Sequence, residues 1–229
     1  MAQFLLAFLV FLLTHSLPSF RALRQSLINR FGRRTYMIGY SILSLASLVW
    51  LFAAFRTADD AALWMDHPWQ AWVTLILTPI GLFLVICGLL SPNPASISFR
   101  GRGKVGAIVA VTRHPVLWGF FLWAFGHIFP NGEWKGLILF GGFSVFAMMG
   151  IFILERRGRR RHGAQWSDVI AATSIFPFLA IFSGRNRFRW DWAVAFSLIV
   201  TVIGTGSLLF AFHEVLFGVD PLLLALYGV

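Results

Sequence analysis

Two histidines flank a long apolar run in the middle of the chain, and histidine in such a setting can do chemistry. His114, within Arg113-His114-Pro115, opens the run, and His127 lies near its far end. An imidazole inside hydrocarbon is costly unless its nitrogens have partners, so a functional role is the default interpretation. Neutral imidazole is a good ligand for haem iron, and a pair of them gives a low-spin b-type haem.

Aromatic side chains crowd the same segment, which favours a flat apolar ligand of the porphyrin type. Phe120 and Trp123 are the candidate haem contacts. The alternative is a helix that packs through its aromatic side chains and satisfies its histidines with water or backbone carbonyls. The full aromatic set is Trp118, Phe120, Phe121, Trp123 and Phe125.

The spacing of the histidines limits which of them can share one iron. His114 and His127 are 13 residues apart. On an α-helix this is a rise of roughly 20 Å, and their directions around the axis differ by about 220°. A single haem cannot take both, so the second ligand must come from another helix. His15 and His213 remain; by counting along the spans, His213 is level with His127 and His15 lies nearer the cytoplasm, an objection that helix tilt can remove.

The elements that must position these histidines are membrane helices. Hydrophobic residues make up 58% of the 229 residues, charged residues 12%, and the mean hydropathy is +0.77. In soluble domains about a quarter of the residues are charged, and apolar runs of about 20 residues can cross a bilayer. We expect an all-α, polytopic membrane helical bundle of about six spans: Ala2–Phe20, Tyr36–Phe55, Trp72–Ser91, Pro115–Phe129, Leu137–Leu154 and Trp192–Phe212.

The basic residues predict the orientation of this bundle. Of the 19 basic residues, 17 lie on one side if the chain crosses six times, and the positive-inside rule makes that side the cytoplasm, with both termini outside. The net charge of +10 therefore reports topology and attraction to anionic membrane lipid, and no nucleic-acid partner is expected. The 17 are Arg21, Arg24, Arg30, Arg33, Arg34, Arg100, Arg102, Lys104, Arg113, Arg156, Arg157, Arg159, Arg160, Arg161, Arg185, Arg187 and Arg189. The acids on the other side are Asp59, Asp60, Asp66, Glu133, Glu214 and Asp220.

We treat residues 1–229 as a single integral membrane domain with two shorter apolar segments. Gly163–Gly184 is interrupted by Pro177 and is expected to form a cytoplasmic interfacial or re-entrant element, with Ser167 or Asp168 capping a helix. The tail from Leu216 is too short to span and is expected at the outer interface. In the fourth span, Gly119 and Gly126 share a face that would let a neighbouring helix, or a flat ligand, approach closely.

Several of these residues also carry a family resemblance. The chain has Thr14-His15-Ser16 followed by basic residues, then TRHPVLWG from Thr112, then the Gly126-His127 pair with Asn131-Gly132. A basic loop with Trp166 and the stretch Thr173–Arg185 follow. This pattern resembles the NnrU family and, more distantly, the 15-cis-zeta-carotene isomerases.

The resemblance implies an integral protein of the bacterial inner membrane in denitrifiers and their relatives. In the isomerase branch it implies a haem b whose redox state gates isomerisation of a polyene double bond. The iron ligands that it implies are His15 and His127, with His114 next to the metal site or on the substrate side. Two functions follow: a redox-linked or nitrogen-oxide-linked accessory protein of denitrification, or a haem-dependent cis–trans isomerase. The oligomeric state is left open.

A second resemblance points to another chemistry. The stretch Arg113–Gly119 and the acid Glu155 resemble the isoprenylcysteine and phospholipid methyltransferases, which bind S-adenosylmethionine beside a pair of glutamates. Here the aromatic residue is shifted by one position, and Arg156 replaces the second acid. A positive charge beside a cationic sulfonium is unfavourable, so methyl transfer is the weaker alternative.

Overall fold

The chain forms helices joined by short loops, as the predicted all-α class requires. The structure, a computed structural model, describes residues 1–59, 61–100 and 103–228. Within these ranges there is no strand, only an isolated bridge between Ala62 and Glu133. The described chain divides into two compact units: unit 1 is 1–63 with 133–135, and unit 2 is 64–132 with 136–229. Asp60 and Arg102, which belong to the charge groups above, lie outside the described residues.

Unit 1 is a helical hairpin with a basic turn. Its elements are α1 (Ala2–Ser16), η1 (Leu17–Ser19), α2 (Arg21–Phe31) and α3 (Arg33–Thr57). Gly32 separates α2 from α3 with a φ of 81°, a left-handed conformation that glycine adopts without strain. Buried Phe4 of α1 contacts Phe55 of α3 edge to face, with ring centroids 5.9 Å apart. Aromatic and aliphatic packing of this kind holds α1 against α3.

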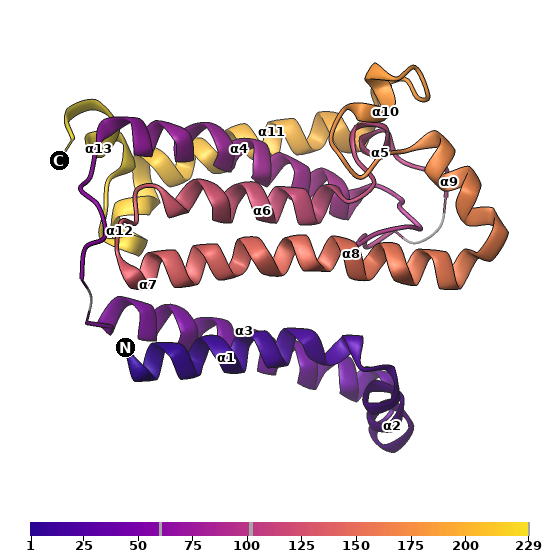
Figure 1. Cartoon of the computed structure of the whole chain (residues 1–229), viewed down its shortest axis with the longest axis horizontal. Helices are drawn as coiled ribbons and strands as arrows, with labels where there is room; N and C mark the ends of the chain where they lie inside the picture. Colours follow the sequence, from indigo (N-terminus) through magenta and orange to yellow (C-terminus); the bar gives the residue numbers. More distant parts are fainter. Residues whose placement is uncertain (60, 101–102, 229) are drawn as a thin grey trace. The chain divides into compact units, whose positions relative to one another are not determined.

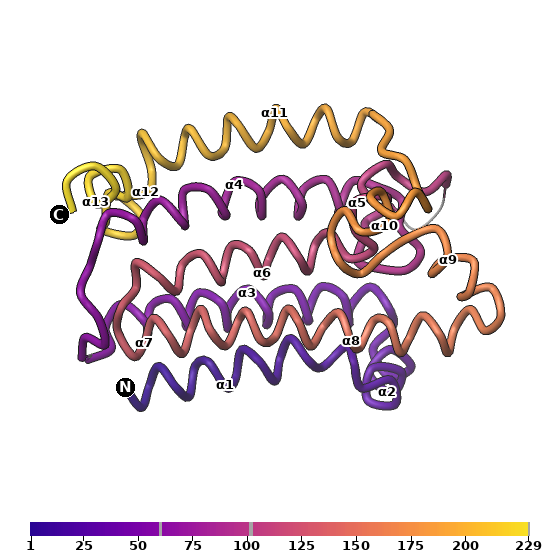
Figure 2. The backbone as a smooth tube through the Cα atoms, turned by 45° about the horizontal axis from the view of Figure 1, so that its top comes forward, coloured from indigo at the N-terminus to yellow at the C-terminus, as the bar shows by residue number. Residues whose placement is uncertain are grey.

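Unit 2 is built around four long helices that lie alongside one another (Figures 1 and 2). They are α4 (Pro68–Leu90), α6 (Pro115–Ile128), α8 (Gly142–His162) and α11 (Trp192–Ser207). Prolines at the first position of α4 and α6 suit helix starts, because the amide hydrogen that proline lacks has no helical partner there. The shorter elements are α5 (Ile108–Val111), α7 (Trp134–Gly136, of which only Gly136 is in unit 2), η2 (Leu137–Gly141), η3 (Gly163–Gln165), α9 (Trp166–Ala172), α10 (Leu179–Phe182), η4 (Leu208–Phe212), α12 (His213–Phe217) and α13 (Pro221–Tyr227).

Glycines set the distance between α4 and α6. A Cβ on Gly81 would lie 2.6 Å from the carbonyl oxygen of Gly119, and a Cβ on Gly119 would meet the carbonyl oxygen of Gly81 even more closely. A Cβ on Gly126 would lie 3.3 Å from Leu77. The close neighbour expected at Gly119 and Gly126 is therefore the helix α4, whose backbone can approach because both sides lack side chains.

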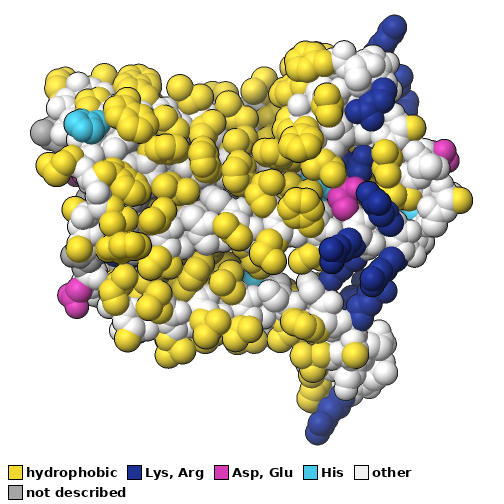
Figure 3. Space-filling model, viewed as in Figure 1, with side chains coloured by type: hydrophobic (Ala, Val, Ile, Leu, Met, Phe, Trp, Pro, Cys, Tyr) yellow, Lys and Arg dark blue, Asp and Glu magenta, His cyan; other side chains and the backbone are white. Residues whose placement is uncertain are grey.

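Membrane-spanning character follows from length and exposed apolar surface. Among the described residues, five helical runs are long and apolar enough to cross a bilayer: Ala2–Ser19, Arg33–Thr57, Pro68–Leu90, Trp134–Ala172 and Trp192–Phe217. The fourth predicted span corresponds to α6, whose 14 residues are apolar but shorter; this is a rise of about 21 Å. Apolar side chains cover the sides of the helices, while lysine and arginine gather where α8 to α10 meet in unit 2 (Figure 3). The prediction of an all-α membrane bundle is confirmed.

The segment 163–184 does contain helix, but its predicted start was wrong. η3 carries α8 into α9, which begins at Trp166, so Ser167 and Asp168 both lie inside the first turn of α9. The Ser167 hydroxyl donates instead to the carbonyl of Ala164, at 2.6 Å. Because the chain continues from one helix into the next through a tight turn, no cap is needed there.

Candidate functional site

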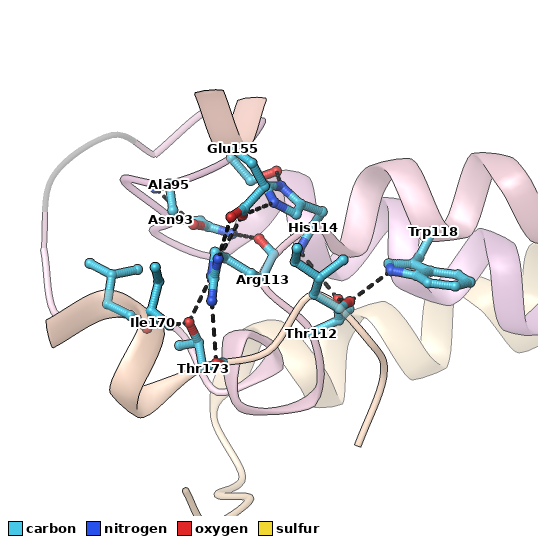
Figure 4. A network of polar contacts seen from close by, with 12 residues as sticks. Asn93, Ala95, Thr112, Arg113, His114, Trp118, Glu155, Ile170 and Thr173 are labelled. Atoms are coloured by element: carbon cyan, nitrogen blue, oxygen red, sulfur yellow. Dashed lines mark hydrogen bonds and ion pairs between the residues drawn. The ribbon is translucent and has the colours of Figure 1, made fainter. Parts of the chain in front are cut away.

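A buried ion pair lies at the basic end of unit 2, where α6 begins. The guanidinium of Arg113 donates through Nη1 to both carboxylate oxygens of Glu155, at 2.6 and 2.8 Å. Its Nε donates to the Thr173 hydroxyl at 2.8 Å, and its Nη2 to the Thr173 carbonyl at 3.3 Å. Figure 4 shows the contacts of Arg113 converging on Glu155 and Thr173. Arg113 and Glu155 are 2% and 7% exposed, so both charges are shielded from water and each is stabilised by the opposite charge of the other.

His114 joins this ion pair through its ring. Its Nε2 lies 2.7 Å from Oε1 of Glu155, and its Nδ1 lies 2.9 Å from the hydroxyl oxygen of Ser96. The imidazole is fully buried, so both nitrogens have protein partners in place of water. We call Ser96, Arg113, His114, Glu155 and Thr173 the polar centre.

The local backbone fixes the position of the polar centre. The side chain of Asn93 donates to the carbonyl of Arg113 at 2.9 Å, and the amide of Arg113 donates to the carbonyl of Ser174 at 2.7 Å. The Ile175 carbonyl accepts from the Thr112 hydroxyl and from the Trp118 indole. The motif around Arg113 and the stretch after Thr173 are thus bonded to each other, although about 60 residues separate them.

One residue at this junction has an unusual backbone conformation. Phe178 has a φ of 64°, which is rare for a bulky side chain and costs conformational energy. Its amide donates to the Val111 carbonyl at 2.8 Å, so the strained turn is held against the residues just before the polar centre. Pro177 precedes Phe178 and α10 follows it. The apolar stretch therefore turns back at Phe178 and lies against Val111.

The indole of Trp166 covers one face of the Arg113 guanidinium. The guanidinium carbon lies 5.4 Å from the centre of the indole, close enough for a cation–π interaction. Gly158 lets the indole approach α8, because a Cβ there would overlap the Trp166 ring. Trp166 is 3% exposed, so it shields the charge of Arg113 from solvent.

This arrangement bears on the methyl-transfer alternative. Glu155, the single acid of the expected pair, is already bonded to Arg113 and His114. Arg156, in the place of the second acid, is exposed. The polar centre therefore offers no spare carboxylate for a cationic cofactor.

His127 lies near the opposite end of α6, away from the polar centre. Its Nδ1 lies 2.7 Å from the carbonyl of Trp123, one helical turn earlier. Its ring is stacked on Phe140 of η2 at a centroid distance of 5.1 Å and lies 5.2 Å from the Trp123 ring. Phe120 stacks on Trp123 at 5.3 Å, so both predicted aromatic contacts belong to one cluster with His127.

His213, the other candidate partner of His127, is the first residue of α12, which lies at the end of unit 2 where α6 ends (Figure 1). The Nδ1 of His213 lies 2.7 Å from the Val219 carbonyl. Both histidines adjoin π-helical turns, since Phe140 lies in η2 and η4 ends at Phe212. Single π turns are rare and frequently mark functional sites.

His15 belongs to unit 1, where it joins α1 to α3. Its Nδ1 lies 3.0 Å from the Phe11 carbonyl, and its Nε2 lies 2.8 Å from the Ser44 hydroxyl. Phe11 also stacks on the ring at 3.9 Å. Because the Ser44 hydroxyl bonds Nε2, iron could bind His15 at that nitrogen only if Ser44 turned away. The pairing of His15 with His127 stays a prediction.

The three histidines share one feature that suits a haem ligand. In each, Nδ1 faces a backbone carbonyl, which fixes the proton on Nδ1 and leaves the lone pair on Nε2. For His127 and His213, Nε2 has no hydrogen-bond partner in the described part of the chain. The residues around His127 therefore fit a histidine that would hold a metal-containing aromatic group. No group of three or more His, Cys, Asp or Glu residues able to hold a metal ion occurs among the described residues.

Sequence reasoning missed much of the polar centre. Ser96 carried no signal, because serine is common in loops, and Thr173 stood out only as the first residue of a stretch that carries the family resemblance. Glu155 stood out only through the resemblance to the methyltransferases, as one acid of a cofactor-binding pair and not as a partner of Arg113. An intramembrane acid flanked by arginines calls for a buried partner, and that argument could have joined it to Arg113.

An apolar helical protein with histidines inside its spans and a buried ion pair at one end belongs to the class of polytopic membrane proteins. Within that class the chain belongs to the NnrU family: the family model described as NnrU protein matches residues 3–221. It is 25% identical over 213 residues to the chloroplastic 15-cis-zeta-carotene isomerase of Arabidopsis thaliana, covering 89% of this chain and 58% of that protein. It is 24% identical over 195 residues to the isomerase of Zea mays, covering 82% of this chain and 52% of that protein. The chain thus spans little more than half the length of these relatives, and no solved structure matches.

Proposed function

We propose that this protein binds one haem b through His127 and uses it in a redox-gated cis–trans isomerisation of a long polyene. The observation that carries the proposal is the setting of His127. Its Nδ1 is bonded to the Trp123 carbonyl, Nε2 is left to bind a metal, and aromatic rings lie on its flanks. A bound haem would supply an iron that changes oxidation state, and the chain would supply the ligand and the dry surroundings.

The chain's own residues have defined parts in this proposal. The Trp123 carbonyl orients the imidazole and raises its basicity, as second partners do for metal-bound histidines. Phe120, Trp123 and Phe140 would pack against a flat apolar group and exclude water. His15 or His213 would hold the haem iron together with His127. A polyene is the substrate class that suits a lipid-embedded site, and it is the class named for the two relatives.

A direct assay tests the isomerase. Purified protein, loaded with haem and reduced, is incubated with 15-cis-zeta-carotene in detergent, and the isomers are separated by chromatography. We expect conversion to the trans isomer by the wild type and none by His127→Ala. A haem-loaded, reduced wild type that leaves the cis isomer unchanged contradicts the isomerase function.

The accessory role in denitrification is the second candidate, and the family match is what favours it. It requires the same haem but no polyene. Deletion in the native host would then alter nitrite or nitric oxide reduction and leave polyene isomers unchanged. If the protein is an isomerase, the same deletion should change the polyene isomers and leave nitrite and nitric oxide reduction unchanged.

A further inference from the structure

We propose that Ser96 is an activated nucleophile that accepts an acyl group from an ester or thioester at the membrane surface. It is the outermost member of a hydrogen-bonded series, Ser96–His114–Glu155, in the polar centre. This activity does not depend on haem. It concerns the end of α6 that lies away from His127.

The direction of the hydrogen bonds makes Ser96 the proton donor. Glu155 is held as a carboxylate by the two short contacts from Arg113, so its oxygens can only accept. The Nε2 of His114, 2.7 Å away, must therefore carry the ring proton. Nδ1 is then the basic nitrogen, and the Ser96 hydroxyl, at 2.9 Å, donates to it. A serine hydroxyl donating to an imidazole that a carboxylate orients is the arrangement that activates serine as a nucleophile.

Burial differs along this series in a way that suits the chemistry. His114 is fully buried and Glu155 nearly so, whereas Ser96 lies in a loop and is half-buried. The base is therefore kept from water and from rotation, while the nucleophile can be reached from outside. The Asn93 amide, which donates to the Arg113 carbonyl and accepts from the Ala95 amide, fixes the loop that carries Ser96.

Backbone amides near Ser96 can stabilise the charge that forms in acyl transfer. The N–H groups of Ser96 and Ile97 have no acceptor among the described residues. The amide that follows a nucleophilic serine is a common oxyanion donor, so Ile97 is in the right place for that role.

The reaction balances with water as the only co-reactant. Ser96 Oγ forms a bond to the carbonyl carbon, its proton passes to His114 Nδ1, and the ester C–O or thioester C–S bond breaks. The same proton goes to the leaving alcohol or thiol. Water then attacks the acyl-serine, gives its proton to Nδ1, and releases the acid as Ser96 recovers its hydrogen. The neighbours Ile97 and Phe99 are 41% and 80% exposed, which favours a fatty acyl chain.

A fluorophosphonate probe tests the proposal on the full-length protein in detergent, with mass spectrometry locating the modified residue. We expect covalent labelling of Ser96, its loss in Ser96→Ala, and unchanged labelling in Ser98→Ala. Ser98 is the matched control because it lies two residues away but donates to the Ser91 carbonyl, at 2.6 Å, and has no imidazole partner. No labelling, or labelling only at another residue, overturns the proposal.

A second measurement tests activation without altering His114, whose substitution could unfold the site. Ser96→Cys and Ser98→Cys are alkylated with iodoacetamide at neutral pH, and the rates are compared by peptide mass spectrometry. A thiol beside His114 loses its proton more readily, so we expect alkylation at 96 to be about ten-fold faster than at 98. Equal or slower alkylation at position 96 contradicts activation by His114.

Discussion

At the scale of single residues, the buried charges of the polar centre are the least expected part of the molecule. Arg113 and His114 stood out in the sequence because they open an apolar run. Their partner Glu155 is 41 to 42 residues away, and no local sequence pattern in either segment predicts the contact. Only the packing of α6 on α8 brings them together, so sequence reasoning found the residues but not the centre.

Removing Glu155 should destabilise unit 2 strongly. Glu155→Ala would leave the guanidinium of Arg113 buried without a counter-charge, and breaking a buried pair in this way costs about 3–5 kcal/mol. Thermal unfolding in detergent measures the effect. The control is Arg156→Ala at the next, exposed position, for which we expect little change. Equal stability of the two variants would show that the ion pair does not hold the fold.

At the scale of elements, the sequence predicted the helices well because each apolar run is long and bounded by charge, proline or glycine. It erred at the start of α9, where the cap residues suggested a break and the chain instead continues through η3. The two π-helical turns, η2 and η4, had no sequence signal. η2 lies against α6 and α8, whereas η4 lies between α11 and α12, so the packing of α6 concerns only the first of these turns.

The close crossing of α4 and α6 gives an element-scale prediction. Gly119→Ala places a methyl group against the Gly81 carbonyl, and neither backbone can move without separating the helices. Overpacking of this kind costs about 1–3 kcal/mol, so the unfolding temperature should fall. Gly206→Ala in α11 is the control, since no atom lies within 4 Å of the added Cβ. A stable Gly119→Ala would mean that α4 and α6 do not approach so closely.

At the scale of the whole molecule, the composition predicted a membrane protein, and the distribution of charge predicted which loops face the cytoplasm. The membrane character follows from the five apolar helical runs of the described chain, while the sides of the membrane stay a prediction from the arginine distribution. The pairing of His127 with a histidine of another helix could not be decided from sequence, because depth counted along spans ignores tilt.

Reporter fusions test that orientation. Fusions after Arg34, Lys104 and Arg161 should report the cytoplasm, because basic loops are retained there. Fusions after Asp60 and at the C-terminus should report the outside. A cytoplasmic C-terminus would require an odd number of crossings and would contradict the six-span arrangement.

The absorption spectrum of the purified protein, as isolated and after reduction, tests the haem most directly. We predict a low-spin b-type spectrum that His127→Ala abolishes or converts to high spin. Loss of the low-spin signal in His15→Ala or in His213→Ala identifies the second ligand. His67→Ala, at an exposed position before α4, and His162→Ala, at the end of α8 where the ring stacks on Trp166, should leave the spectrum unchanged. A folded protein that carries no haem even when haem is supplied during expression, or one whose spectrum survives His127→Ala, would contradict the central claim.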